Sequence, residues 1–308
     1  MIKVVNINKK YGDFEVLKNI SFEIKKGSIY GFLGPNGAGK TTTMNILSGL
    51  IDFNSGEIYL DGEDFKKNKR QLLRKVGYLP QNPVFYNYMN AVEYLHFIGE
   101  IARMPQKNIR ERTTEILKIV KLSSVAKRKI GQYSGGMKQR LGIAVALFNK
   151  PEIVFLDEPT SALDPEGRME ILEFIKDLKS NGTTVFISTH ILSDIERICD
   201  EVSILDKGLI LISDNLESLK SKYIQPIFDI EFEKHCVNLD KILLNFKWVE
   251  KVLINENKAS IYVNDLDVAK SELLKLLVKG ENNILSYHLR KSNLEDIFIR
   301  LVNKNDNL

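Results

Sequence analysis

A glycine-rich run near residue 34 limits the possible folds of this chain more than any other part of its sequence. The run reads Gly34-Pro35-Asn36-Gly37-Ala38-Gly39-Lys40-Thr41-Thr42 and matches the phosphate-loop pattern G-x-x-x-x-G-K-[ST]. Its glycines let backbone amides approach phosphate oxygens at the start of a helix, whose dipole favours negative charge. We expect Lys40 on the β- and γ-phosphates and Thr41 on Mg²⁺. A glycine turn that only caps a helix is the structural alternative.

The surroundings of this run indicate an α/β fold. The apolar segment Ser28–Leu33 precedes it, and a helix is expected from Gly39 to Ser48. The spacing of apolar residues also has a helical period over parts of residues 92–122. Strands that alternate with helices are typical of an α/β sheet, and near-continuous apolar strands are typical of buried parallel ones. Further strands are predicted at Lys3–Asn8, Phe14–Leu17, Ile20–Ile24, Glu57–Leu60, Val76–Leu79, Ile153–Leu156 and Thr184–Ser188.

The pattern of apolar strands, helix-like segments and glycine turns changes within Asp214–Gln225. This change predicts two domains, residues 1–220 and 221–308. The second part is expected to be a small α+β domain with the βαββαβ order of ferredoxin-like folds. It shows no catalytic constellation, because the adjacent His235 and Cys236 lack metal-ligand spacing. Its expected elements are strand Ile227–Phe232, helix Leu239–Phe246, strands Val249–Ile254 and Ala259–Val263, helix Asp267–Val278, strand Ile284–Leu289 and a last helix Asn293–Val302.

Composition excludes several classes of protein. The 308 residues are 44% hydrophobic with a net charge of +4, which argues against a disordered chain and gives no reason to expect a nucleic acid partner. The sequence contains no run of about 18 apolar residues, so no membrane-spanning helix is expected. The N-terminus does not resemble a secretory signal. Two cysteines cannot build a disulfide framework, so an intracellular location is expected.

Polar side chains follow three of the predicted strands. Asp157 and Glu158 end one strand, where Asp157 suits Mg²⁺ through water and Glu158 suits the general base for an attacking water. His190 ends the next strand, about 30 residues later, and is expected to hydrogen-bond the γ-phosphate and the water. Gln81 follows a third strand and offers a neutral amide to Mg²⁺ or water. The alternative is that Asp157 and Glu158 are only solvated polar residues at the end of a strand.

A second anion site is predicted by the segment Tyr133-Ser134-Gly135-Gly136-Met137-Lys138-Gln139-Arg140. It places a serine hydroxyl and the amides of Gly135 and Gly136 at the start of a predicted helix. Two phosphate sites on one chain make sense if each completes the pocket of another subunit. An N-capped helix with a glycine turn is the structural alternative.

With these motifs in this order, residues 1–220 resemble the ATP-binding cassette (ABC) ATPases. The resemblance implies a cassette with a mixed sheet core, an antiparallel β subdomain and a helical subdomain at about residues 82–150. It further implies that Ser134 and Gly136 contact the γ-phosphate of the opposite subunit, that Tyr11 stacks on adenine, and that the segment ending at Asp164 crosses the dimer interface near the nucleotide. Tyr133 and Met137 depart from the usual leucine and glutamine of the signature.

The resemblance implies an ATP-hydrolysing subunit that binds ATP and Mg²⁺, pairs with a second cassette and drives a separate transmembrane permease. The short segment Ser292–Phe298 is similar to a C-terminal element of bacterial drug- and peptide-resistance exporters, so export is expected. Such a subunit would be cytoplasmic and peripheral on the inner face of the membrane. We expect aromatic residues after Gln81 to contact the permease, with core packing as the alternative. A soluble ABC ATPase that remodels a nucleic acid or ribosomal complex, another P-loop NTPase and a regulatory module without turnover are the rival hypotheses.

Overall fold

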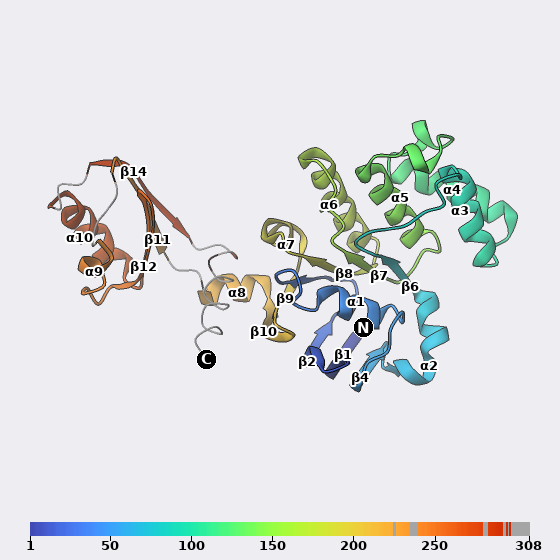
Figure 1. The fold of residues 1–308 in the computed structure, drawn as a ribbon, viewed down its shortest axis with the longest axis horizontal. Coiled ribbons are helices and arrows are strands. Elements are labelled where there is room, and N and C mark those ends of the chain that lie inside the picture. Colours follow the sequence, from blue (N-terminus) through green and yellow to red (C-terminus); the bar gives the residue numbers. More distant parts are fainter. Residues whose placement is uncertain (224–225, 235–238, 280–282, 292–293, 295, 297–308) are drawn as a thin grey trace. The chain divides into compact units, whose positions relative to one another are not determined.

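The computed structural model describes residues 1–223, 226–234, 239–279, 283–291, 294 and 296. The chain divides into two compact units, Met1–Leu216 and Glu217–Leu308 (Figure 1). Each unit has its own hydrophobic core. Among the described residues, no helix combines the length and the apolar character that crossing a membrane requires.

A six-stranded sheet forms the centre of the first unit. Its order is β10 (Leu209–Asn215), β9 (Glu201–Asp206), β3 (Ile29–Leu33), β8 (Thr184–Thr189), β7 (Ile153–Asp157) and β6 (Val76–Leu79). All neighbours are parallel except β10, which pairs antiparallel with β9. Strands β3, β7 and β8 are buried along their whole length, as expected for parallel strands covered on both faces. Their carboxyl ends therefore meet at one edge of the sheet.

A smaller antiparallel sheet packs against this centre. Its order is β2 (Phe14–Ile24), β1 (Ile2–Tyr11), β4 (Ser55–Leu60) and β5 (Glu63–Asp64). The two strands expected at Phe14–Leu17 and Ile20–Ile24 are one strand, which passes through Asn19 at a φ of 55°. Phe22 of this sheet stacks near Tyr30 and Phe186 of the central sheet, with ring centroids 5.7 Å apart in both pairs. This contact joins the two sheets in one core.

Helices surround the central sheet. Helix α1 (Lys40–Leu47) follows β3, α6 (Pro165–Ser180) lies between β7 and β8, and α7 (Leu192–Ile198) follows β8. Helices α3 (Ala91–Ile101), α4 (Gln106–Ile119) and α5 (Gly135–Leu147) lie beyond β6 in the region expected to be a helical subdomain (Figure 1). Asn90 and Glu93 begin α3 with a capping box, in which each side chain accepts from the other's backbone N–H. The first unit also contains α2 (Phe65–Leu72) and short 3₁₀ turns at Leu73–Lys75, Ser123–Val125 and Ile130–Gln132, and α8 (Leu216–Tyr223) begins at the boundary between the units.

The second unit has the predicted βαββαβ order. Its elements are β11 (Pro226–Phe232), α9 (Leu239–Leu243), β12 (Val249–Asn255), β13 (Lys258–Val263), α10 (Leu266–Lys279) and β14 (Ile284–Lys291). The strands form an antiparallel sheet in the order β12-β13-β11-β14, and apolar residues of both helices share its core. Helix α9 is shorter than expected, because the side chain of Asn245 donates to the carbonyl of Lys241 and competes with a further turn.

The chain beyond β14 lies mostly outside the described residues. This applies to most of the last helix predicted at Asn293–Val302, and also to His235 and Cys236. Of the exporter-like segment, Leu294 and Asp296 are described, and both are buried. The carboxylate of Asp296 accepts from the hydroxyl of Tyr262 at 2.9 Å and from the guanidinium of Arg290. Asp296 therefore ties this part of the chain to strands β13 and β14.

Candidate active site

The phosphate loop connects β3 to α1 in the way its sequence predicts. Gly39 is the N-cap of α1 with a φ of 111°, a value that glycine adopts readily. A β-carbon on Gly34 would lie 2.3 Å from the carbonyl oxygen of Leu205, so only glycine fits there. Lys40 is almost completely buried, and its Nζ donates to the carbonyls of Gly34 at 2.7 Å and Pro35 at 3.2 Å. The loop thus folds around the ammonium group that its own helix provides.

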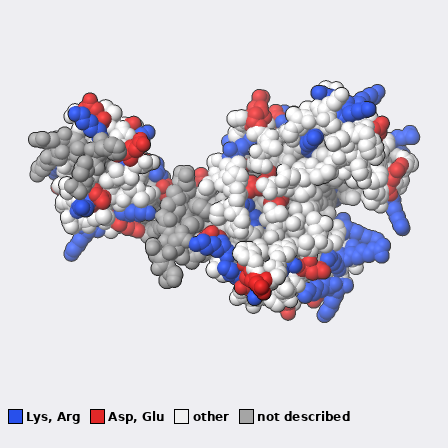
Figure 2. Space-filling model, viewed as in Figure 1, with Lys and Arg blue, Asp and Glu red and all other residues white. Residues whose placement is uncertain are grey.

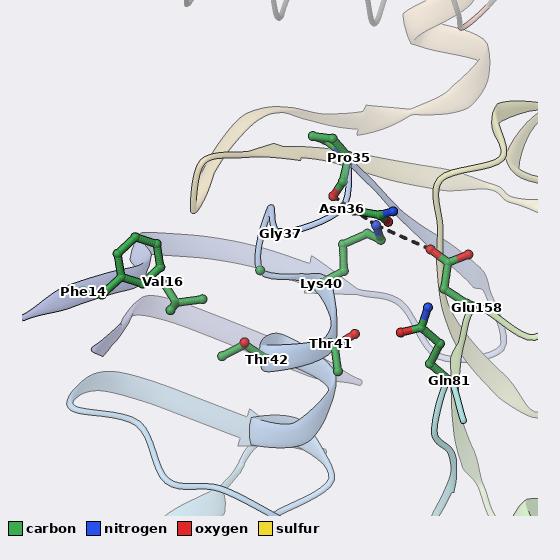
Figure 3. A pocket seen from close by; sticks show the side chains of 11 residues that line it. Phe14, Val16, Pro35, Asn36, Gly37, Lys40, Thr41, Thr42, Gln81 and Glu158 are labelled. Atoms are coloured by element: carbon green, nitrogen blue, oxygen red, sulfur yellow. Dashed lines mark hydrogen bonds and ion pairs between the residues drawn. The ribbon is translucent and has the colours of Figure 1, made fainter. Parts of the chain in front are cut away.

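A pocket of about 370 Å³ opens in front of this loop (Figure 3). Residues from four separate parts of the chain meet there: strand β2, the loop with α1, the segment after β6, and the residue that follows β7. In Figure 3, Gln81 and Glu158 lie close together across from the loop. The pocket is lined by Phe14, Val16, Pro35, Asn36, Gly37, Gly39, Lys40, Thr41, Thr42, Gln81 and Glu158. Most of the phosphate-loop residues named from the sequence, together with Gln81 and Glu158, therefore share one cavity.

Glu158 is held in a strained and well-defined position. Its φ is +50°, a conformation that costs energy for a non-glycine residue and is frequent at functional sites. Its carboxylate is buried, with Oε1 3.5 Å from Nζ of Lys40 and Oε2 2.9 Å from Nδ1 of His190. The His190 side chain is 49% exposed, so it lies between the buried carboxylate and solvent. A buried carboxylate beside a histidine and facing a phosphate loop is arranged to polarise a water molecule.

Asp157 has the properties of a cation ligand. It is completely buried, its Oδ1 accepts from the hydroxyl of Ser188, and its Oδ2 has no hydrogen-bond partner among the residues that the structure describes. Burial raises the pKa of Asp157 above its ordinary value of 3.8 and the nearby Glu158 adds to this, whereas the hydroxyls of Ser188 and Thr41 and the charge of Lys40 oppose it. An unpaired buried carboxylate oxygen beside a threonine hydroxyl fits Mg²⁺, which prefers such oxygen ligands.

The charge on Asp157 should cost stability when no metal is bound. We predict that Asp157→Asn raises the free energy of unfolding by about 1 to 2 kcal/mol at pH 7 in EDTA, because a neutral amide replaces a buried carboxylate with an unpaired oxygen. The gain should shrink as the pH falls through the raised pKa of Asp157, where protonation neutralises the native side chain. Denaturant titration at several pH values measures both effects.

The matched control for this substitution is Asp164→Asn. Asp164 is an exposed N-cap of α6 that accepts from the backbone N–H of Gly167 at 3.2 Å. Asparagine caps helices about as well as aspartate, so this variant should unfold like the native chain. A loss of stability on Asp157→Asn would contradict the electrostatic description of this position.

The wall of the pocket includes two apolar residues that sequence reasoning missed. Phe14 and Val16 of β2 line the pocket, and Phe14 is 71% exposed. Tyr11, the residue predicted to stack on adenine, does not line it, and its ring lies 4.8 Å from Nζ of Lys9. Phe14 and Val16 are two positions apart on a strand and so share a face, which is the signal that could have pointed to them. Stacking by Tyr11 stays a prediction, and Phe14 is a second candidate.

The predicted second anion site lies outside this pocket. Ser134 is the N-cap of α5, and its Oγ accepts from the backbone N–H of Met137 at 3.3 Å. Ser134 and Gly135 are exposed, and neither they, Gly136 nor Asp164 line the pocket around Lys40. A β-carbon added to Gly136 would lie 3.1 Å from Cδ2 of Leu163, so the start of α5 packs against the segment that ends at Asp164. The pocket around the phosphate loop and the exposed N-terminus of α5 are therefore separate in this chain.

Together the fold and the site define a P-loop ATPase with the architecture of an ATP-binding cassette. Residues 17–161 match the family described as ABC transporter, and residues 215–302 match the family described as the C-terminal domain of DrrA1-3-like ATP-binding proteins. The chain belongs to the ATP-binding proteins of ABC transporters.

Two curated relatives and one solved structure illustrate this membership. The uncharacterized ABC transporter ATP-binding protein YxlF of Bacillus subtilis is 38% identical over 98% of this chain and 99% of its own length. The bacitracin transport ATP-binding protein BcrA of Bacillus licheniformis is 36% identical over 98% of this chain and 97% of its own. A dimeric ATP-binding cassette in a post-hydrolysis state, bound to ADP and Pi, is 31% identical with a TM-score of 0.65 over 70% of this chain and 99% of its own. The predicted cassette fold and the predicted ATPase activity are confirmed.

Proposed function

We propose that this ATPase subunit forms a head-to-tail sandwich with a second cassette around two ATP molecules and so drives export through a separate membrane permease. The observation that carries this proposal is the separation of the two phosphate-binding elements. Ser134 begins a helix at the surface, whereas Lys40 and Glu158 line the pocket. The surface site has a role only if it completes the pocket of another subunit, and a dimer related by two-fold symmetry supplies both pockets at once.

Within each pocket the residues of this chain have distinct roles. The phosphate loop and Lys40 bind the β- and γ-phosphates, and Phe14, with Val16, forms an apolar surface for the base. Glu158 takes a proton from the attacking water while His190 orients the water and the γ-phosphate. The signature residues Ser134, Gly135 and Gly136 bind the γ-phosphate of the ATP held in the partner subunit's pocket. Asp164 lies in the segment that reaches the interface.

Mg²⁺ would be held by Asp157, Thr41 and Gln81. When bound, the ion neutralises charge that develops on the phosphate oxygens. The unpaired Oδ2 of Asp157 supports this assignment. Within the described part of the chain, no group of three or more His, Cys, Asp or Glu residues could hold a metal alone. This agrees with a site in which phosphate oxygens complete the coordination.

The surface that would contact the permease is an aromatic cluster formed by the segment between β6 and α3 and by α3 itself. Its rings contact one another at centroid distances of 5.2 to 6.3 Å, so they form one patch. Tyr86 is 48% and Tyr88 68% exposed, and Val84 beside them is 88% exposed. Exposed aromatic patches are typical of protein interfaces. The cluster consists of Phe85, Tyr86, Tyr88, Tyr94 and Phe97.

We propose that the exported cargo belongs to the drug or peptide class, because one curated relative that spans nearly the whole chain is described as a bacitracin transport ATP-binding protein. The subunit would then lie in the cytoplasm on the inner face of the membrane. A nucleic acid partner is not supported, because Figure 2 shows basic and acidic side chains interspersed on the visible face of each unit. The densest basic group there lies over α2, which contributes Lys66, Lys67, Lys69 and Arg70.

Affinity purification from native membranes tests the proposed function. Tagged Glu158→Gln chain with Mg-ATP should hold the closed dimer and co-purify a multi-span membrane protein in stoichiometric amount, together with any second cassette. Tyr88→Ala in the same background should reduce this recovery several-fold, because it removes an exposed aromatic contact. Ile101→Ala is the control, since Ile101 is 65% exposed at the other end of α3. Recovery of ribosomes or soluble partners alone would contradict the transporter assignment.

A further inference from the structure

A buried carboxylate outside the nucleotide pocket connects the segments that carry the two catalytic side chains. Asp194 lies in the first turn of α7 and is only 1% exposed. Its Oδ2 accepts from Oγ1 of Thr160 at 2.7 Å. Its Oδ1 accepts from Nε of Arg168 at 2.7 Å, and Nη2 of the same guanidinium lies 2.6 Å away. Both oxygens are therefore paired with groups from other elements.

The two partners belong to the segment that follows β7. Thr160 is 1% exposed and lies two residues after Glu158, whereas Asp194 lies four residues after His190. The Thr160–Asp194 hydrogen bond therefore joins the loop after β7 to the loop and helix after β8. Further bonds fix the same loop: Oγ of Ser161 and Nε2 of Gln139 both donate to the backbone carbonyl of Glu158, at 3.0 and 3.4 Å. The positive φ of Glu158 needs such support from its surroundings.

A local explanation for Asp194 does not account for this arrangement. An acidic residue in the first turn of a helix is favoured by the helix dipole, and a solvent-exposed side chain would be enough for that. A buried carboxylate is costly unless charge-assisted hydrogen bonds compensate it, so its placement between Thr160 and Arg168 indicates a tie between elements. Arg168 is also anchored to the first turn of α7, because its Nη2 donates to Oγ of Ser193 at 2.7 Å.

We propose that Asp194 is a positioning residue for hydrolysis, which holds Glu158 and His190 at their mutual distance by clamping Thr160 and Arg168. This inference rests on the roles given above to Glu158 and His190. The 2.9 Å contact between the two catalytic side chains depends on segments that leave neighbouring strands. The clamp joins the segment after β7 to helix α7, which follows β8. The clamped segment also reaches Leu163, which packs on Gly136, so its position affects the start of the signature helix.

The test is Thr160→Val, which removes the hydroxyl donor and keeps the size and branching of the side chain. We expect kcat for ATP hydrolysis to fall about 30-fold with KM changed less than about twofold, since small misplacements of catalytic groups have effects of this order while the phosphate loop is untouched. Thr160→Ser, which keeps the donor, should recover kcat to within about threefold. A purely structural role would change stability without separating kcat from KM.

Thr184→Val is the matched control. Thr184 is fully buried at the opposite end of β8, and its hydroxyl accepts from the backbone N–H of Gly27 at 2.9 Å. It should lose a similar hydrogen bond and stability while kcat stays within about twofold. Equal losses of kcat in the two valine variants, or unchanged kcat in Thr160→Val, would overturn the inference. If Thr160→Val does not fold, Asp194→Asn is measured in its place with the same expected result.

Glu158→Gln separates failure of this inference from failure of the proposed catalytic site. If Glu158→Gln abolishes hydrolysis and Thr160→Val does not slow it, the site assignment stands and the clamp is wrong. If Glu158→Gln remains active, the assignment of the general base is itself wrong.

Discussion

Glu158→Gln is expected to lower kcat for ATP hydrolysis at least about 100-fold while ATP still binds. General base catalysis contributes about 10² to 10⁴ to a rate, and a neutral amide cannot take the proton of the attacking water. The amide keeps the shape of the buried side chain and can still bond Nδ1 of His190. It also removes a negative charge near the γ-phosphate, so the affinity for ATP should stay the same or rise. Single-turnover hydrolysis and equilibrium binding of a fluorescent ATP analogue measure the two quantities.

Glu152→Gln provides the comparison for this variant. Glu152 lies immediately before β7, at the other end of the strand that Asp157 ends, and is partly exposed near Lys75. Its loss of charge should leave turnover unchanged, because exposed ion pairs contribute little. Hydrolysis at the native rate by Glu158→Gln would show that another group accepts the proton.

The meeting of Glu158 and His190 follows from strand order. They are 32 residues apart, but each comes directly after a buried apolar strand, and β7 and β8 are parallel neighbours. Any pair of adjacent parallel strands brings its carboxyl ends together, so a pattern of two strands with polar ends predicts the contact. The phosphate loop was predictable for a related reason. The backbone at positions 34 and 39 leaves no room for, or strongly disfavours, any residue other than glycine, so the loop has a recognisable sequence.

Other parts of the site depend on packing that no local pattern reports. The contribution of Phe14 and Val16 to the pocket wall depends on how the antiparallel sheet packs on the central one. The bond between Thr160 and Asp194 joins a loop to a short helix 34 residues later. Neither residue belongs to a sequence pattern that predicts this contact. The backbone strain at Glu158 is likewise imposed by tertiary contacts, because glutamate has no preference for positive φ.

Lys40→Met is expected to weaken ATP binding roughly 30- to 100-fold without unfolding the chain. The ammonium of Lys40 would bind the β- and γ-phosphates with charge-assisted hydrogen bonds, and loss of such a buried charged partner costs about 2 to 5 kcal/mol, where 1.4 kcal/mol is tenfold in Kd. Lys40 has to give up its hydrogen bonds to the carbonyls of Gly34 and Pro35 when it binds phosphate. The expected loss of binding free energy therefore lies near the lower end of that range. Methionine retains most of the length of the side chain and fills the same space.

The same substitution separates binding from catalysis when it is compared with Glu158→Gln. Lys40→Met removes the cation 3.5 Å from the buried Glu158 carboxylate, so it should also lower the free energy of unfolding. Lys150→Met is the control, because Lys150 is 72% exposed and lies 4.0 Å from its nearest carboxylate. Calorimetric titration with Mg-ATP gives Kd for each variant. Native affinity in Lys40→Met would mean that the glycine-loop amides alone hold the nucleotide. If instead Lys40→Met loses ATP binding and Glu158→Gln keeps it, then the phosphate loop determines affinity and the residue after β7 determines turnover.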